Sequence, residues 1–150
     1  DADKLTPALH LSQTQYLRQI IGTDLYNYYV TAITALIANN TPIPTNHANL
    51  LNDYIKPILI HLTLSEYLKS GAFLVSNKGI YKHTSENSSE ATSEEIKELV
   101  QLERDRAESY TERFLDHMSF YASANFPEWF SNSNDELSPN YKSYTIDWVI

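Results

Sequence analysis

The stretch "TSEEIKELVQLERDRAESYTERFLDHMSFYASAN", residues 92–125, predicts one long helix that decides the fold. Apolar residues recur along it at spacings of three and four, which places them on one face of a helix. Thr92 and Glu95 form a capping box at its start, and Glu94 lies where the helix dipole favours negative charge. Some 30 residues at about 1.5 Å each give a helix of roughly 45 Å, longer than a compact domain of this size needs.

The segments before residue 92 also carry helical patterns. Ser12 begins a capping box ahead of a short helix that Gly22 ends, and Thr23 caps a second helix. A third helix is expected over about 48–70, with a bend where Pro57 removes a backbone donor. Glycines number only 3, too few for many tight turns. The sequence therefore predicts an all-α bundle of about four helices.

A polar stretch, "SNKGIYKHTSENSSEAT" at residues 76–92, separates the third helix from the long one. Short apolar runs on either side of Asn77-Lys78-Gly79 are typical of a hairpin, so we expect a polar loop or small hairpin at 73–92. A polar connection of about 17 residues is long for an idle link in a compact domain. A linker, a lid and a partner-binding arm all remain open for residues 76–92.

The chain ends in "YKSYTIDWVI", residues 141–150, where apolar side chains alternate with the period of a strand. The last 22 residues, outside any predicted helix, include Trp129, Phe130, Tyr141, Tyr144, Ile146, Trp148 and Ile150. Exposed aromatics in a tail indicate a surface that binds a partner. We therefore divide the chain into a helical domain, 1–130, and an extended interaction tail, 131–150. The alternative is that the tail folds back onto its own bundle.

The net charge of −8 is concentrated in the second half of the chain. Residues 84–150 carry five Lys and Arg against fourteen Asp and Glu. A basic footprint for gripping phosphates is missing, and no apolar run reaches the roughly 20 residues that cross a membrane. The composition thus argues against a phosphate-binding surface for nucleic acid and against a membrane span.

Few residues suggest catalytic chemistry. Glu108, Glu112 and Asp116 follow one another at intervals of four and share a helix face, either as a solvated stripe or as carboxylates for a metal or for acid–base work. His61 and His117 lie on predicted helices that could bring them together, but no pair of histidines has the spacing of metal ligands on one helix. We expect no cofactor, no metal site and no catalytic residue.

The order of segments resembles the head–tail connector, or adaptor, proteins of tailed bacteriophages, those of crAss-like phages above all. The matching pieces are "YLRQIIGTDLYNYY", "LLNDYIKPILIHLTLSEYL", "VSNKGIYKHTSENSSEAT" and a long acidic helix that ends in "FPEW". The likeness covers most of residues 12–130. It implies a non-enzymatic virion protein in the phage neck, assembled in the host cytoplasm as a ring of about twelve copies.

The resemblance also implies the partners. The ring would join the portal protein to adjacent tail or stopper proteins and extend the DNA channel. Neighbouring subunits or the portal would contact the tail and the arm residues Asn77, Lys78, Gly79, Ile80 and Tyr81. Glu108, Glu112 and Asp116 would face the channel, where negative charge repels phosphate and lets DNA pass without binding.

Two alternatives remain from the residues themselves. A cellular helical interaction or regulatory domain would use the same arm and tail without forming a ring. A helical enzyme with carboxylate-bound metal is the less favoured alternative. Metal content and oligomer mass distinguish the three functions.

If residues 76–92 are an assembly arm, their backbone amides should exchange hydrogen rapidly in the free subunit and slowly in the assembled particle, because contact with a partner removes them from water. Hydrogen–deuterium exchange read by mass spectrometry checks this. Equal exchange in the two states would show that the stretch is only a linker.

Overall fold

The computed structural model describes residues 2–71, 73–76, 79–82, 92–131 and 137–139, and confirms the predicted all-α class. The helices are α1 (Ala2–Leu11), α2 (Arg18–Ile21), α3 (Thr23–Asn39), α4 (Thr45–Leu50), α5 (Lys56–Gly71) and α6 (Ser93–Asn125). Shorter turns are the π-helical η1 (Ser12–Leu17) and η2 (Leu51–Ile55) and the 3-10 turn η3 (Pro127–Trp129). Strands β1 (Phe73–Ser76) and β2 (Gly79–Lys82) pair as an antiparallel hairpin, one of the two forms expected for this region.

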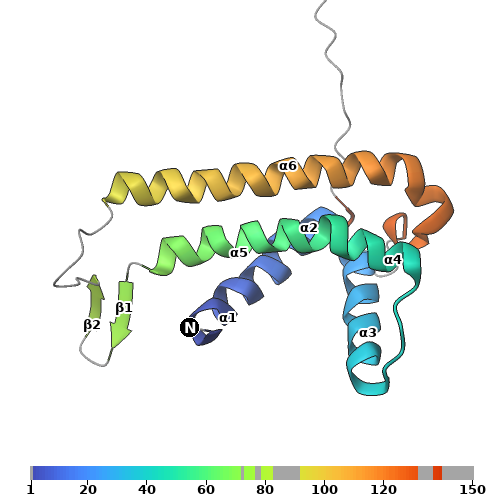
Figure 1. Cartoon of the computed structure of the whole chain (residues 1–150), viewed down its shortest axis with the longest axis horizontal. Helices are drawn as coiled ribbons and strands as arrows, with labels where there is room; N and C mark the ends of the chain where they lie inside the picture. The colour runs from blue at the N-terminus through green and yellow to red at the C-terminus, as the bar shows by residue number, and fades with distance from the viewer. Residues whose placement is uncertain (1, 72, 77–78, 83–91, 132–136, 140–150) are drawn as a thin grey trace, which may run out of the picture.

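Helix α5 lies between α6 on one side and α1 on the other (Figure 1). The long α6 runs beside α5, and α3 projects from one end of this layer. The hairpin lies at the opposite end. Two faces of the molecule are therefore exposed. One is the side of α6 away from α5, and the other is formed by α1 and α3.

The predicted start of α6 is confirmed. The Glu95 backbone N–H donates to Thr92 Oγ1 at 3.1 Å, and the Thr92 backbone N–H donates to Glu95 Oε2 at 2.7 Å, so the capping box is complete. These hydrogen bonds from Thr92 lower the pKa of the Glu95 carboxyl. The helix continues for 33 residues, roughly 50 Å, and ends where Pro127 begins η3.

The hydrophobic core lies where the C-terminal half of α6 meets α5, α3 and η3. Its buried members are Leu17, Ile21, Leu25, Tyr29, Leu50, Ile55, Ile58, Phe114, Leu115, Met118, Ala122, Phe126 and Trp129. Trp129 packs edge-to-face on Phe114 with 5.4 Å between ring centroids and is only 4% exposed. The assignment of Trp129 to a partner interface is therefore wrong, because η3 turns its indole into the core. Phe130, which follows it, is 57% exposed.

One predicted helix feature near the N-terminal half is corrected, and the structure shows what surrounds a second one. Ser12 does not cap a helix, because α1 begins at Ala2 and η1 continues it, and the Ser12 hydroxyl is buried without a hydrogen-bond partner. Pro57 does disturb its helix, but the disturbance takes the form of the π turn η2, after which α5 begins at Lys56. A π turn changes the hydrogen-bond register just before the residue that cannot donate.

The first part of the tail belongs to the helical body. Ser131 donates to Asp24 Oδ2 at 2.6 Å, and the Thr23 backbone N–H donates to the Leu137 carbonyl at 2.9 Å. Pro139 is buried and lies against Gly22. The predicted boundary after residue 130 is thus too early, while residues 140–150 lie outside the described residues.

Replacing Gly22 by Ala should destabilise the fold. Gly22 has φ +80°, and a Cβ there would lie 2.8 Å from Pro139 Cδ. Backbone strain alone should cost about 1–3 kcal/mol, and the clash adds to it. Urea unfolding followed by circular dichroism measures the change.

Pro139→Ala provides the matched control, because it removes the ring that the new methyl group would meet. The double variant should therefore lose less than the sum of the two single losses. A Gly22→Ala protein as stable as the wild type would contradict both the positive φ of residue 22 and its contact with Pro139.

Candidate functional site

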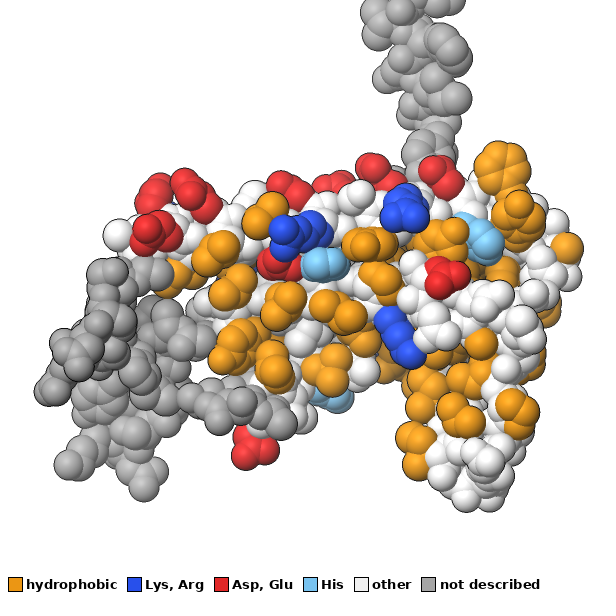
Figure 2. Space-filling model, in the orientation of Figure 1, with side chains coloured by type: hydrophobic (Ala, Val, Ile, Leu, Met, Phe, Trp, Pro, Cys, Tyr) orange, Lys and Arg blue, Asp and Glu red, His pale blue; other side chains and the backbone are white. Residues whose placement is uncertain are grey.

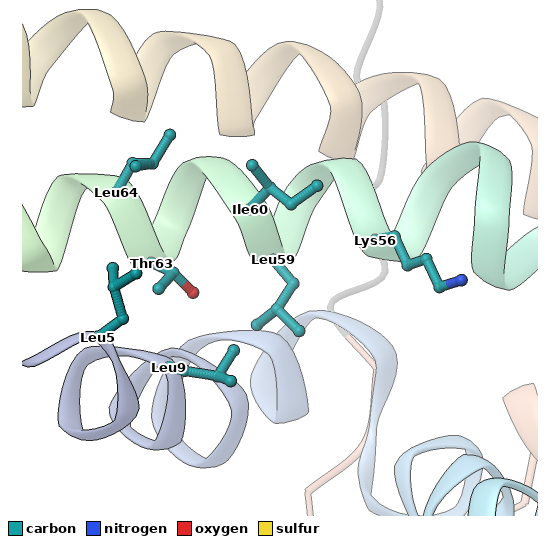
Figure 3. Close-up of a pocket in the computed structure, with 7 residues that line it drawn as sticks. All are labelled: Leu5, Leu9, Lys56, Leu59, Ile60, Thr63 and Leu64. Atoms are coloured by element: carbon teal, nitrogen blue, oxygen red, sulfur yellow. The ribbon is translucent and has the colours of Figure 1, made fainter. Parts of the chain in front are cut away.

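An apolar groove lies between α1 and α5 and extends over the part of α5 that carries Ile60 and Leu64 (Figure 3). It holds about 370 Å³ and is lined by Leu5, Leu9, Lys56, Leu59, Ile60, Thr63 and Leu64. Of the lining residues that the structure describes, Lys56 is the single charged one. We call this surface the α1–α5 groove.

A second hollow of about 270 Å³ adjoins it under the exposed side of α3. Leu17 of η1, Leu51 and Ile55 of η2, and Val30 and Ile33 of α3 contribute to its lining. Lys56 and Leu59 line both hollows, so the two adjoin each other along α5, and we call them together the trough. We call the second part the α3 hollow.

Hydrophobic side chains remain exposed along the rim of the trough. The members are Leu5, Leu9, Val30, Ile33, Ile60 and Leu64, with Leu36 and Ile37 further along α3. Figure 2 shows hydrophobic side chains gathered on this face over α1, α5 and α3. Contiguous apolar surface is common at interaction sites, so this face is the candidate site.

Thr63 introduces one polar group into the α1–α5 groove. Thr63 is 8% exposed, and its hydroxyl oxygen has no hydrogen-bond partner. Figure 3 draws this oxygen pointing from α5 toward α1. A buried hydroxyl without a partner is costly, and a ligand in the groove that accepts or donates a hydrogen bond there would remove that cost.

The outer face of α6 is acidic. The carboxylates at Glu108, Glu112 and Asp116 are exposed, as predicted for a shared helix face. The same face continues toward the helix start, so the acidic stripe consists of Glu94, Glu98, Asp105, Glu108, Glu112 and Asp116. Acidic side chains line the edge of α6 away from α5 in Figure 2. Across the described ranges, no group of three or more His, Asp or Glu side chains is placed to hold a metal ion.

A polar cluster fixes α5 to α6. His61 Nδ1 donates to Glu103 Oε2 at 2.6 Å, and Arg106 Nη1 donates to Glu103 Oε1 at 2.5 Å. The His61 ring also stacks on Tyr110 with 5.6 Å between centroids. Because both oxygens of Glu103 already accept hydrogen bonds, this carboxylate anchors two helices.

The Glu103 carboxyl is buried, and burial alone would raise its pKa. The hydrogen bonds and positive charges of His61 and Arg106 outweigh that effect, so the pKa of Glu103 lies below its usual value. Elsewhere, burial lowers the pKa of His117, against a smaller opposing effect of Asp53. Burial also raises the pKa of Tyr29, with further contributions from Tyr28 and Glu128.

His61 and His117 each have separate partners. His117 contacts the rings of Tyr54 and Tyr121, with its Nδ1 3.4 Å from the Tyr54 hydroxyl. A third histidine, His47, is buried beside Tyr28 and Phe126. These histidines therefore serve packing in the described structure.

Most predicted interface residues fall outside the part of the chain whose side chains the structure describes. Gly79, Ile80 and Tyr81 lie on β2. The others outside the described residues are Asn77, Lys78, Tyr141, Tyr144, Ile146, Trp148 and Ile150. The α1–α5 groove was not predicted, although Leu5 and Leu9 have the spacing of neighbours on a helix face.

No helix among the described residues combines the length and the hydrophobicity that a membrane crossing requires. The model of a family of unknown function, DUF6712, matches residues 17–137. No curated protein matches the chain. No solved structure does so either.

Replacing Glu103 by Gln should lower stability at neutral pH by roughly 1–3 kcal/mol, because hydrogen bonds to a buried charge are lost or weakened. A carboxyl with a lowered pKa in the folded chain stabilises the fold above its unfolded pKa, close to 4.5, and loses that effect as pH falls through the folded pKa. The stability gap between wild type and variant should therefore narrow below pH 4.5.

Denaturant titrations between about pH 7 and about pH 3 measure this gap. Glu98→Gln, at an exposed position of the same helix, is the matched control and should show little gap at any pH. A gap for Glu103→Gln that stays constant down to the lowest pH would contradict the charged anchor.

Proposed function

We propose that this chain, which belongs to the DUF6712 family of proteins of unknown function, is a structural subunit of a homo-oligomeric ring at the head–tail junction of a tailed phage. In this role it joins the portal to the adjacent tail or stopper proteins, and the ring surrounds the DNA channel. The subunit performs no reaction and needs no cofactor. Its location is the neck of the virion.

The observation that carries the proposal is the trough of apolar residues on α1, α5 and α3. Its exposed rim, from Leu5 and Leu9 to Val30 and Ile33, is too hydrophobic to be left to water in a working protein. A subunit that covers such a face with an identical neighbour buries the face in every copy when a ring closes. The apolar surface therefore supports a subunit that assembles with identical copies, rather than an enzyme with one catalytic pocket.

The acidic stripe supports a second part of the role. Helix α5 separates the stripe on α6 from the trough beside α1, so the two surfaces can serve different purposes at once. One can bind the neighbouring subunit while the other faces the channel. Negative charge along a channel wall repels the DNA backbone and keeps it from sticking.

The phage setting comes from the order of segments in the sequence. The short helix, the Pro57 helix, the polar stretch at 76–92 and the long acidic helix follow one another as in head–tail connectors. The described helices keep that order. The family match covers nearly the same residues, 17–137, and leaves the function of the family open.

A cellular interaction domain is the second candidate, because an apolar trough also suits a single partner. A carboxylate enzyme has less support. The most buried carboxylate, Glu103, is engaged by His61 and Arg106, and the acidic stripe lies open on a helix surface.

The oligomer mass and the metal content of the purified protein test the proposal. We expect a closed ring in mass photometry and in electron-microscopy class averages, without stoichiometric metal. A metal-free monomer or dimer at every concentration would favour the interaction domain. Bound iron or manganese in stoichiometric amounts would favour the enzyme.

A further inference from the structure

We infer that the α1–α5 groove receives the C-terminal segment, residues 141–150, of a neighbouring copy of this chain. The inference rests on the proposed ring and names the contact that links one subunit to the next. The groove is an acceptor on one face of the subunit, and the segment is a donor attached elsewhere. A donor–acceptor contact of this kind is heterologous, and a heterologous contact repeated from copy to copy closes into a ring when the rotation between neighbours divides a full turn.

The lining of the groove suits an extended apolar peptide. Leu5, Leu9 and Leu59 give it hydrophobic walls, and the trough continues past Lys56 into the α3 hollow. Between Tyr144 and Ile150 the sequence places an apolar residue at every second position. An extended segment presents those residues on one side, so that they can enter the groove together.

The unpartnered hydroxyl of Thr63 indicates what else the occupant supplies. Side chains that fill the groove with hydrocarbon alone would leave that hydroxyl buried and unsatisfied. An extended peptide carries backbone carbonyl and N–H groups along its length, and either can pair with a hydroxyl. Thr63 therefore favours a polypeptide over a lipid or another pure hydrocarbon.

The charges are complementary as well. Among the described residues, Lys56 is the only charged member of the groove lining, and Asp147 is the only charged residue in the sequence between Tyr144 and Ile150. When the apolar side of the segment enters the groove, Asp147 turns toward the rim. The long side chain of Lys56 can follow it there.

The reach of the segment is sufficient for a neighbour. Pro139 is fixed against Gly22, so the segment that can reach outward begins at residue 140. Residues 140–150, fully extended, span about 36 Å, whereas the stretch of α5 from Lys56 to Leu64 rises only about 12 Å. The segment can therefore leave its own subunit and still lie along the whole groove of the next one.

Peptide binding to full-length protein tests the docking directly. A dye-labelled peptide of residues 140–150 is titrated against a full-length tail variant, Ile146→Ser with Trp148→Ser, whose own segment cannot compete. We expect saturable binding by fluorescence polarisation. Adding Ile60→Glu, at a groove residue 55% exposed, should weaken it at least tenfold, whereas Leu102→Glu at an exposed apolar residue of α6 is the matched control and should not.

Thr63→Val separates docking from a structural role. The change removes a buried unsatisfied hydroxyl, so it should leave the free subunit as stable as before or more so. In the tail-variant background it should still weaken peptide binding roughly five- to tenfold, because one hydrogen bond to the peptide is lost. Absent peptide binding, or binding that neither Ile60→Glu nor Thr63→Val weakens, would overturn the inference.

Mixing two full-length variants identifies the source of the segment. The tail variant keeps its groove, and Ile60→Glu keeps its tail, so neither should form rings alone. Their mixture should give heterodimers in native mass spectrometry, each held by one tail in one groove. Peptide binding without heterodimers would show that the segment occupies its own groove and would overturn the contact between neighbours.

The wild-type protein distinguishes failure of this inference from failure of the proposed function. If both the wild type and the tail variant form rings, the tail contact is overturned and the proposed ring stands. Heterodimers from the mixture without wild-type rings would support the tail contact and count against the ring.

Discussion

Helix α5 has to bury two opposite faces at once, and the remaining structure follows from that requirement. On one face, His61 hydrogen-bonds Glu103 of α6, and Ile58 is buried in the core that α6 helps to form. On the other face, Leu59 and Thr63 turn toward α1. A helix that is apolar on both sides needs a partner on each. Helix α6 runs along the full length of α5, whereas α1 is shorter and the groove remains beside it.

The parts of the fold that were predictable from sequence are those with a local cause. The start of α6 depends on Thr92 and Glu95, three residues apart, and its face on repeating apolar spacing. The cap predicted at Ser12 is wrong because a capping box is also a local pattern. The same residues occur here inside a helical run that begins ten residues earlier. Trp129 could not be placed, since its partner Phe114 is brought to it by the turn at Pro127.

The candidate surfaces divide in the same way. The acidic stripe follows from intervals of four along a single helix, so the spacing of Glu108, Glu112 and Asp116 is enough to assign them to one face. The α1–α5 groove joins Leu5 and Leu9 to residues some fifty positions later, and no local pattern links them. The sequence does not predict that the Thr63 hydroxyl is buried without a hydrogen-bond partner, because this depends on which residues surround it in the fold.

The two π turns have a consequence for how this fold can vary. Both η1 and η2 border the α3 hollow, through Gln13 and Leu17 on one side and Leu51 and Ile55 on the other. A π turn holds one residue more than the α-helical turn it replaces, and one residue corresponds to a rotation of about 100° around the helix. Loss of a single codon in either turn would leave a regular helix but swing every side chain beyond it to a new direction. A change in length of one residue in either turn would therefore redirect the walls of the trough.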